Sequence, residues 1–246
     1  MSVTLHHGDC LGFMKDIPSR SVDLILCDLP YGTTQNKWDS IIPLDSLWSA
    51  YLRIAKENAA IVLTATQPFT SKLVMSQPNI FKYEWIWEKH HGTGHLNAKK
   101  QPLRKHEQIL VFYGNQPTYN PQKTTGHSRV KVSKKSGENC KGSSNYGEQV
   151  RTDYDSTERY PTTLLRIPSD KQRSSLHPTQ KPVALMEYLI KTYTNEGDTV
   201  LDNCMGSGTT GTACKNLNRK FIGIEKDENY FNIAKTRIEG VMGATL

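Results

Sequence analysis

The sequence predicts an α/β protein with a doubly wound, mostly parallel sheet and an inserted basic recognition region. Short apolar runs typical of buried strands alternate with segments whose apolar residues recur at helical spacing. Two of the expected strands, residues 22–27 and 198–201, lead directly into an acidic residue followed by turn-forming residues. Ligands bind at the carboxyl ends of strands in open α/β sheets, so these two strand ends are candidate functional sites.

The first 113 residues hold the first part of the expected sheet. Apolar side chains over residues 44–55 recur at helical spacing, and Pro68 is favoured in the first turn of a helix. Aromatic side chains alternate over residues 81–87, as is typical of a strand. We expect strands at residues 3–6, 22–27, 59–64, 81–87 and 107–113, and helices at residues 10–17, 44–55 and 68–76.

The C-terminal part continues the same alternation. Apolar side chains over residues 183–193 recur at helical spacing, and Asp227 is a suitable N-cap for a last helix. We expect strands at residues 199–201 and 221–224, and helices at 183–193, at 209–217 and after Asp227.

The middle of the chain has a different composition. Residues 89–175 contain 16 Lys or Arg against 7 Asp or Glu, whereas the rest of the chain contains 15 against 17. A solvated basic loop is one explanation, but the regional bias favours a surface for a phosphate backbone. We therefore divide the chain into a catalytic part (1–113), an inserted target-recognition region (114–175) and a cofactor-binding part of the same core (176–246).

Length and composition restrict the class of protein. A chain of 246 residues fits one large domain, or one domain with an insertion. No apolar run approaches the ~20 residues of a membrane span, and the N-terminus lacks the pattern of a signal peptide. The five cysteines form no C-x-x-C pair, which argues against a disulfide framework and a zinc site and favours the cytoplasm.

A glycine turn after the strand at 198–201 predicts a nucleoside-type cofactor site. Gly206 and Gly208 allow backbone N–H groups to approach a ligand at the start of a helix. Glu225 ends the next strand, 23 residues after Asp202, and suits a ribose hydroxyl. A structural turn and a surface acid are the alternatives. The missing third glycine and the missing Gly-Lys-Ser loop favour a mononucleoside.

Together these motifs resemble the S-adenosylmethionine (SAM)-dependent DNA amino-methyltransferases. Their catalytic motif, (Asp/Asn/Ser)-Pro-Pro-(Tyr/Phe/Trp), is matched by residues 28–31 with Leu29 in place of the first Pro. Their His-Pro-Thr-Gln-Lys-Pro segment is matched at residues 177–182. The catalytic motif precedes the cofactor motif, as in the permuted beta group. The resemblance implies a Rossmann-like methyltransferase fold, and we expect Leu29 to leave activity in place with a less rigid turn.

The resemblance also implies site residues. The side chain of Asp28 and the backbone carbonyl of Leu29 would hold the amino group of the target base, and Tyr31 would stack on that base. Asp9 would approach the adenine of SAM, with a helix cap as the alternative, and Lys181 would lie near the carboxylate end of SAM or on the surface. The expected catalytic residues are Asp28, Leu29, Pro30 and Tyr31. The expected SAM-binding residues are Asp9, Cys10, His177, Thr179, Lys181, Asp202, Cys204, Gly206, Ser207, Gly208, Thr209, Glu225 and Lys226. The expected DNA-binding residues are Lys89, Lys99, Lys100, Arg104, Lys105, Lys134 and Lys135.

The sequence thus predicts a site-specific methyltransferase that transfers a methyl group from SAM to N6 of an extruded adenine in double-stranded DNA. Asp rather than Ser at position 28 favours adenine, and cytosine N4 is the alternative. A methyltransferase that acts on RNA or on a protein side-chain amide would have the same kind of motif and is another alternative. A catalytically decayed DNA-binding protein is the non-enzymatic alternative. We expect no metal and no membrane partner, and a cognate restriction enzyme and a homodimer stay open.

Overall fold

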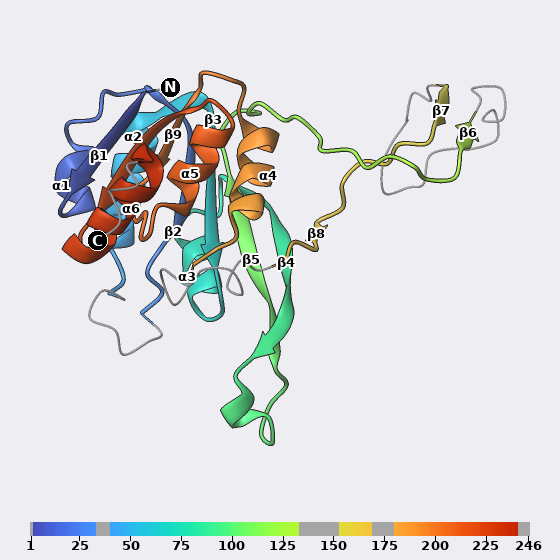
Figure 1. Cartoon of the computed structure of the whole chain (residues 1–246), viewed down its shortest axis with the longest axis horizontal. Coiled ribbons are helices and arrows are strands. Elements are labelled where there is room, and N and C mark those ends of the chain that lie inside the picture. Colours follow the sequence, from blue (N-terminus) through green and yellow to red (C-terminus); the bar gives the residue numbers. More distant parts are fainter. Residues whose placement is uncertain (1, 33–39, 133–152, 169–179, 241–246) are drawn as a thin grey trace. The chain divides into compact units, whose positions relative to one another are not determined.

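The computed structural model describes residues 2–32, 40–132, 153–168 and 180–240 of the chain (Figure 1). The helices are α1 (Cys10–Met14), α2 (Leu44–Ile54), α3 (Phe69–Ser76), α4 (Val183–Tyr193), α5 (Thr209–Asn216) and α6 (Glu228–Glu239), with a 3-10 turn η1 (His95–Asn97). The strands are β1 (Val3–His7), β2 (Val22–Asp28), β3 (Ala55–Ala65), β4 (Phe81–Thr93), β5 (Arg104–Phe112), β6 (Val130–Val132), β7 (Tyr154–Ser156), β8 (Leu164–Leu165), β9 (Thr199–Asp202) and β10 (Lys220–Glu225).

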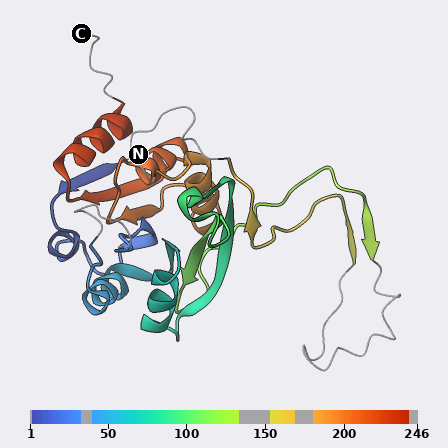
Figure 2. The ribbon, with the colours of Figure 1, turned by 90° about the horizontal axis from the view of Figure 1, so that it is seen from below.

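Within the described residues, eight strands form one sheet in the order β1–β10–β9–β2–β3–β5–β4–β8. All neighbouring pairs in this sheet are parallel except those that β5 makes with β3 and β4. The N-terminal strand therefore lies beside strands from the C-terminal part, as the blue and red ribbons show in Figure 1 and Figure 2. The prediction of a mostly parallel α/β sheet is confirmed.

The side chains of the central strands alternate between two hydrophobic cores, one on each face of the sheet. Leu24 and Leu26 of β2 join the core covered by α4, α5 and α6, while Ile25 and Cys27 join the core covered by α1, α2 and α3. Helices on both faces explain why β2 reads as a continuous apolar run rather than an alternating one. The sheet is doubly wound, as predicted.

The order of the strands also brings the two predicted strand ends together. From β2 the chain moves outward to β3, whereas from β9 it moves to β10 on the opposite side. Leu24 pairs with Val200 and Ile25 with Leu201, so Asp28 and Cys204 follow at similar levels beyond the paired segment. This point of reversal is where open α/β sheets bind ligands.

The hairpin of β4 and β5 is longer than the sequence predicted. β4 continues to Thr93, not to residue 87, and β5 begins at Arg104, not at residue 107. The added residues are polar, and backbone pairing such as Thr93 with Arg104 extends the strands without an apolar signal. Figure 1 shows this hairpin extending beyond the helices.

Contacts group Pro121–Thr162 as a separate compact unit, and all the other described residues as one unit. Within the small unit β6 and β7 pair antiparallel, and Arg129 donates from Nε and Nη2 to the two carboxylate oxygens of Asp155, each at 2.6 Å. The division at residues 114 and 175 that we drew from composition stays a prediction.

Candidate active site

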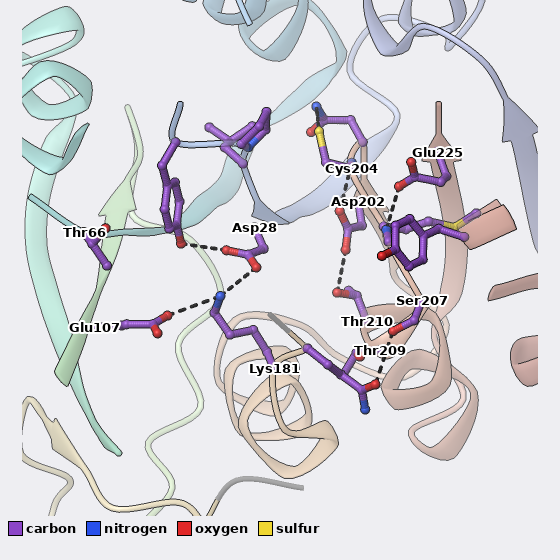
Figure 3. A pocket seen from close by; sticks show the side chains of 18 of the residues that line it. Asp28, Thr66, Glu107, Lys181, Asp202, Cys204, Ser207, Thr209, Thr210 and Glu225 are labelled. Atoms are coloured by element: carbon purple, nitrogen blue, oxygen red, sulfur yellow. Dashed lines mark hydrogen bonds and ion pairs between the residues drawn. The ribbon is translucent and has the colours of Figure 1, made fainter. Parts of the chain in front are cut away.

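A cavity of about 1110 Å³ opens at the carboxyl ends of β1, β2, β9 and β10. Asp9, Asp28, Asp202 and Glu225 follow or end these four strands and all line it. Glu107 of β5 lines the same cavity beyond Asp28, as Figure 3 shows. The sheet therefore gathers carboxylates from distant parts of the sequence around one space.

The glycine turn between β9 and α5 has two glycines with different tasks. Gly206 has a φ of 51°, lines the cavity, and donates its N–H to Glu225 Oε2 at 2.8 Å. Gly208 has a φ of 77° and is the N-cap of α5, and a Cβ there would lie 2.9 Å from the Cβ of Ala234. Gly208 is outside the cavity lining, and the close approach of α6 explains why this position is a glycine. The predicted contact of Gly208 with SAM stays a prediction.

Two acids lie beside this turn, Asp202 buried and Glu225 half-buried. Burial raises the pKa of Asp202 to about 7, although hydrogen bonds from Thr210 Oγ1 (2.6 Å) and the N–H of Cys204 (3.1 Å) favour its charged form. Burial also raises the pKa of Glu225, whose Oε1 accepts the N–H of Asp227 at 2.8 Å. Both carboxylates keep lone pairs for a ligand, because each oxygen can accept more than one hydrogen bond.

Asp9 serves the structure and lines the site at the same time. Its Oδ1 accepts the N–H groups of Leu11 (3.0 Å) and Gly12 (3.2 Å), which caps α1, and the residue lines the cavity. The two readings of Asp9 from the sequence are therefore compatible. The other predicted SAM-binding residues that line the cavity are Cys10, Lys181, Cys204, Ser207, Thr209 and Lys226.

This lining fits the SAM that the sequence implies. SAM carries a cationic sulfonium and an ammonium group, and its ribose hydroxyls and adenine amino group donate hydrogen bonds. Asp9, Asp202 and Glu225 supply acceptors and negative charge along one wall. The acceptors and negative charge of these side chains are therefore complementary to the donors and positive charge of SAM.

The catalytic motif lies directly after β2. Asp28 Oδ1 accepts the hydroxyl of Tyr31 at 2.7 Å and also the hydroxyl of Thr64 on β3. The ring of Tyr31 packs 5.4 Å from the ring of Phe69, and Leu29 is buried. Asp28, Leu29, Pro30 and Tyr31 all line the cavity. The motif is thus held by its own hydrogen bonds with its carboxylate facing the cavity.

Lys181 forms an ion pair with the catalytic carboxylate of Asp28. Its Nζ is 2.6 Å from Asp28 Oδ2 and 3.2 Å from Glu107 Oε2, and its side chain is only 6% exposed. Burial would raise the pKa of Asp28, but the charge and hydrogen bond of Lys181, with Thr64 and Tyr31, hold it below its usual range. Burial would lower the pKa of Lys181, but the charge of Asp28 above all holds it well above its usual range. The predicted contact of Lys181 with SAM stays a prediction.

The predicted DNA-binding lysines occupy different environments. Lys89 pairs with Glu107 at 3.2 Å and is 15% exposed, while Lys105 pairs with Glu88 at 3.0 Å. Arg104 of the β4–β5 hairpin lines the cavity. Two further predicted lysines are exposed near the tip of this hairpin, namely Lys99 and Lys100. His177, Thr179, Lys134 and Lys135 lie outside the described residues.

The sequence analysis missed several residues of this site. Thr64 contacts Asp28, Glu107 contacts Lys181, and Thr210 contacts Asp202. Gln180 lines the cavity and accepts the hydroxyl of Ser207 at 3.4 Å. An acid at the start of an otherwise apolar strand was a signal for Glu107. Thr64 offered no signal, because Thr is common in strands.

The described ranges 2–32, 40–132, 153–168 and 180–240 contain neither a metal-binding cluster nor a membrane-spanning helix. In them no group of three or more His, Cys, Asp or Glu side chains is arranged to hold a metal ion. No helix among the same residues is both long and apolar enough to cross a bilayer.

Comparisons with known proteins agree with this geometry. A family model described as DNA methylase, of the N6/N4 methyltransferases, matches residues 22–236. The type II methyltransferase M.HpaI of Haemophilus parainfluenzae is 31% identical over 92% of this chain and 71% of its own length. The DNA adenine methyltransferase YhdJ of Escherichia coli K12 is 28% identical over 96% of this chain and 82% of its own. The crystal structure of the M1.HpyAVI–SAM complex superposes with a TM-score of 0.66, at 26% identity over 96% of this chain and 98% of that one. The chain therefore belongs to the N6/N4 methyltransferase family of DNA methylases.

Proposed function

We propose that this SAM-dependent DNA methyltransferase acts on N6 of an adenine within a specific site of duplex DNA. The target base must leave the stack, because its amino group is otherwise inside the duplex. When bound, SAM supplies the sulfonium methyl group that is transferred. Cytosine N4 is the alternative acceptor.

The observation that carries this proposal is the ionised Asp28 in the same cavity as the acids of the glycine-turn side. The lone pair of an exocyclic amino nitrogen is delocalised into the base ring. Acceptors for its two N–H groups would favour a tetrahedral nitrogen with a free lone pair, and Asp28 and the carbonyl of Leu29 supply them. The cavity, about 1110 Å³, exceeds the ~300–1,000 Å³ of a typical single-ligand pocket. That volume supports a site for both a cofactor and an extruded base.

Tyr31 supports the proposal in two ways. Its hydroxyl is bound by Asp28 at 2.7 Å, which restricts the orientation of the ring. A base stacked on such a ring gains ~1–3 kcal/mol. Adenine is preferred over cytosine because the motif begins with Asp and because YhdJ, which matches nearly the whole chain, is named as an adenine methyltransferase.

The proposed DNA surface includes the β4–β5 hairpin and the basic residues 114–175. Lys99 and Lys100 are exposed on the hairpin, and Arg104 of the same hairpin lines the cavity. These cations would bind phosphates of the DNA backbone. Polar side chains of residues 114–175 would read the sequence. A cognate restriction enzyme and a homodimer stay predictions of the sequence.

Expression in a host without DNA methylases tests the function directly. Plasmid DNA is digested to nucleosides and analysed by mass spectrometry. We expect N6-methyladenine from the wild-type protein, none from Asp28→Ala, and wild-type levels from Asp16→Ala, which removes an exposed acid outside the cavity lining. N4-methylcytosine would establish the alternative acceptor, and the absence of both products would refute the proposed activity.

A further inference from the structure

Four alternating charges form a row from the β4–β5 hairpin to the catalytic motif. Lys89 Nζ lies 3.2 Å from Glu107 Oε1, Lys181 Nζ lies 3.2 Å from Glu107 Oε2, and Lys181 Nζ lies 2.6 Å from Asp28 Oδ2. The four side chains are 15%, 16%, 6% and 26% exposed in that order along the row, so all are largely shielded from water. Removing one member of such a row leaves an uncompensated charge in a poorly solvated place.

The existing contacts of Asp28 limit its capacity to accept a hydrogen bond from the target amino group. Its Oδ1 already accepts Tyr31 and Thr64, and its Oδ2 is bound by Lys181. An ionised carboxylate has about four acceptor positions, so little capacity is left for an amino group. The target nitrogen also becomes positively charged as it takes the methyl group. An ammonium group held at Asp28 Oδ2 would oppose that charge at short range.

Glu107 offers Lys181 a second position. Its Oε2 is buried and has no hydrogen-bond partner among the described residues, although Lys181 Nζ is only 3.2 Å away. A buried acceptor without a hydrogen bond is uncommon and calls for an explanation. A small movement of the Lys181 ammonium toward Glu107 would satisfy this oxygen and release Asp28 Oδ2.

We propose that Glu107 is a positioning residue for methyl transfer, which draws Lys181 away from Asp28 when the target base enters. Asp28 Oδ2 then accepts an N–H of the target amino group, and the negative charge of Glu107 balances the displaced ammonium. This inference rests on the proposed function, because it takes Asp28 as the acceptor of the target amino group.

The test compares Glu107→Gln with Glu88→Gln in single-turnover assays at saturating SAM and DNA. Glu88 is on the same hairpin and pairs with Lys105 and Arg166, but it is outside the cavity lining, so it is a matched loss of one charge. We expect Glu107→Gln to lower the transfer rate about tenfold or more, a coupling typical of residues in one salt-bridge network. SAM affinity and the KM for DNA should change by less than about twofold in either variant. Glu107→Asp, which keeps the charge, should recover part of the rate.

Lys181→Met provides the decisive background. Without the ammonium, Asp28 has nothing to release, so adding Glu107→Gln should cost much less than it does in the wild type. An equal cost in both backgrounds would overturn the inference. So would a rate for Glu107→Gln within about twofold of wild type, or a loss of SAM binding and melting temperature in both Glu107 variants, which would indicate a structural role. A wild-type protein that methylates no DNA would instead refute the proposed function, which separates the two failures.

Discussion

SAM affinity should depend on pH through Asp202. Burial raises the pKa of this carboxyl to about 7, so at pH 6 roughly one molecule in ten carries it ionised. A cationic ligand favours the ionised form, and binding near pH 6 therefore releases a proton. Affinity should rise about tenfold from pH 6 to pH 8 if this carboxylate alone is responsible.

The perturbation is Asp202→Asn, which cannot ionise and keeps one oxygen that can accept the N–H of Cys204, while the hydroxyl of Thr210 can turn to accept from the new amide N–H. Calorimetry at pH 6, 7 and 8, in two buffers of different ionisation enthalpy, measures both affinity and proton release. We expect the variant to lose most of the pH slope and to bind at pH 8 no more tightly than the wild type binds at pH 6, because it is never ionised. A smaller slope should remain from Glu225, whose pKa burial also raises.

The sign for folding is opposite to the sign for binding. Because the folded state holds its proton up to about pH 7 and the unfolded chain loses it near 3.8, the free energy of unfolding should fall as the pH rises between these values. Asp202→Asn should weaken that decline. An unchanged pH slope of SAM affinity in Asp202→Asn would show that this carboxylate does not face the cationic groups of SAM. Asp16→Asn is the control and should match the wild type.

Three other changes have expected results. In Gly211→Ala the new Cβ would lie 2.3 Å from an α6 side chain, so the free energy of unfolding should fall by ~1–3 kcal/mol and the melting temperature by roughly 3–10 °C. Gly12→Ala is the control, because its new Cβ meets nothing within 4 Å and should leave stability unchanged. Equal melting temperatures of the two variants would contradict this prediction. Glu225→Gln should weaken SAM binding by ~1.5–3 kcal/mol, or roughly ten- to a hundredfold by calorimetry. Unchanged affinity would show that Glu225 does not bind the ribose hydroxyls. Lys99→Ala and Lys100→Ala should each lower DNA affinity for all sequences and reduce the salt slope by up to ~1, and a slope equal to that of the wild type would remove these lysines from the phosphate surface.

Most of the sheet was predictable because its signals are local. The apolar run of β2 and the glycine turn after β9 are each contained in a few consecutive residues. The ends of β4 and β5 were not predictable in the same way. Their polar residues continue the strands through backbone pairing, and such pairing produces no apolar pattern in the sequence.

The site was predictable only as far as its motifs. Asp28, Asp202 and Glu225 stood out because each ends a strand, and the fold brings all three to one cavity. Gly208 stood out as part of the glycine turn, but the close approach that requires a glycine there comes from α6, an element that begins 20 residues later. Sequence position alone does not distinguish a glycine that faces a ligand from one that faces a helix.

The sequence by itself determined the fold class, the two motifs and the family, because alternation, turn chemistry and motif spacing are properties of short segments. Only the tertiary structure decided that Lys181 forms an ion pair with Asp28, 153 residues earlier in the chain, and that Glu107 pairs with the same lysine. An ion pair depends on the distance between charged atoms that separate elements bring together. That distance is set by the packing of strands and helices, and no short stretch of sequence contains it.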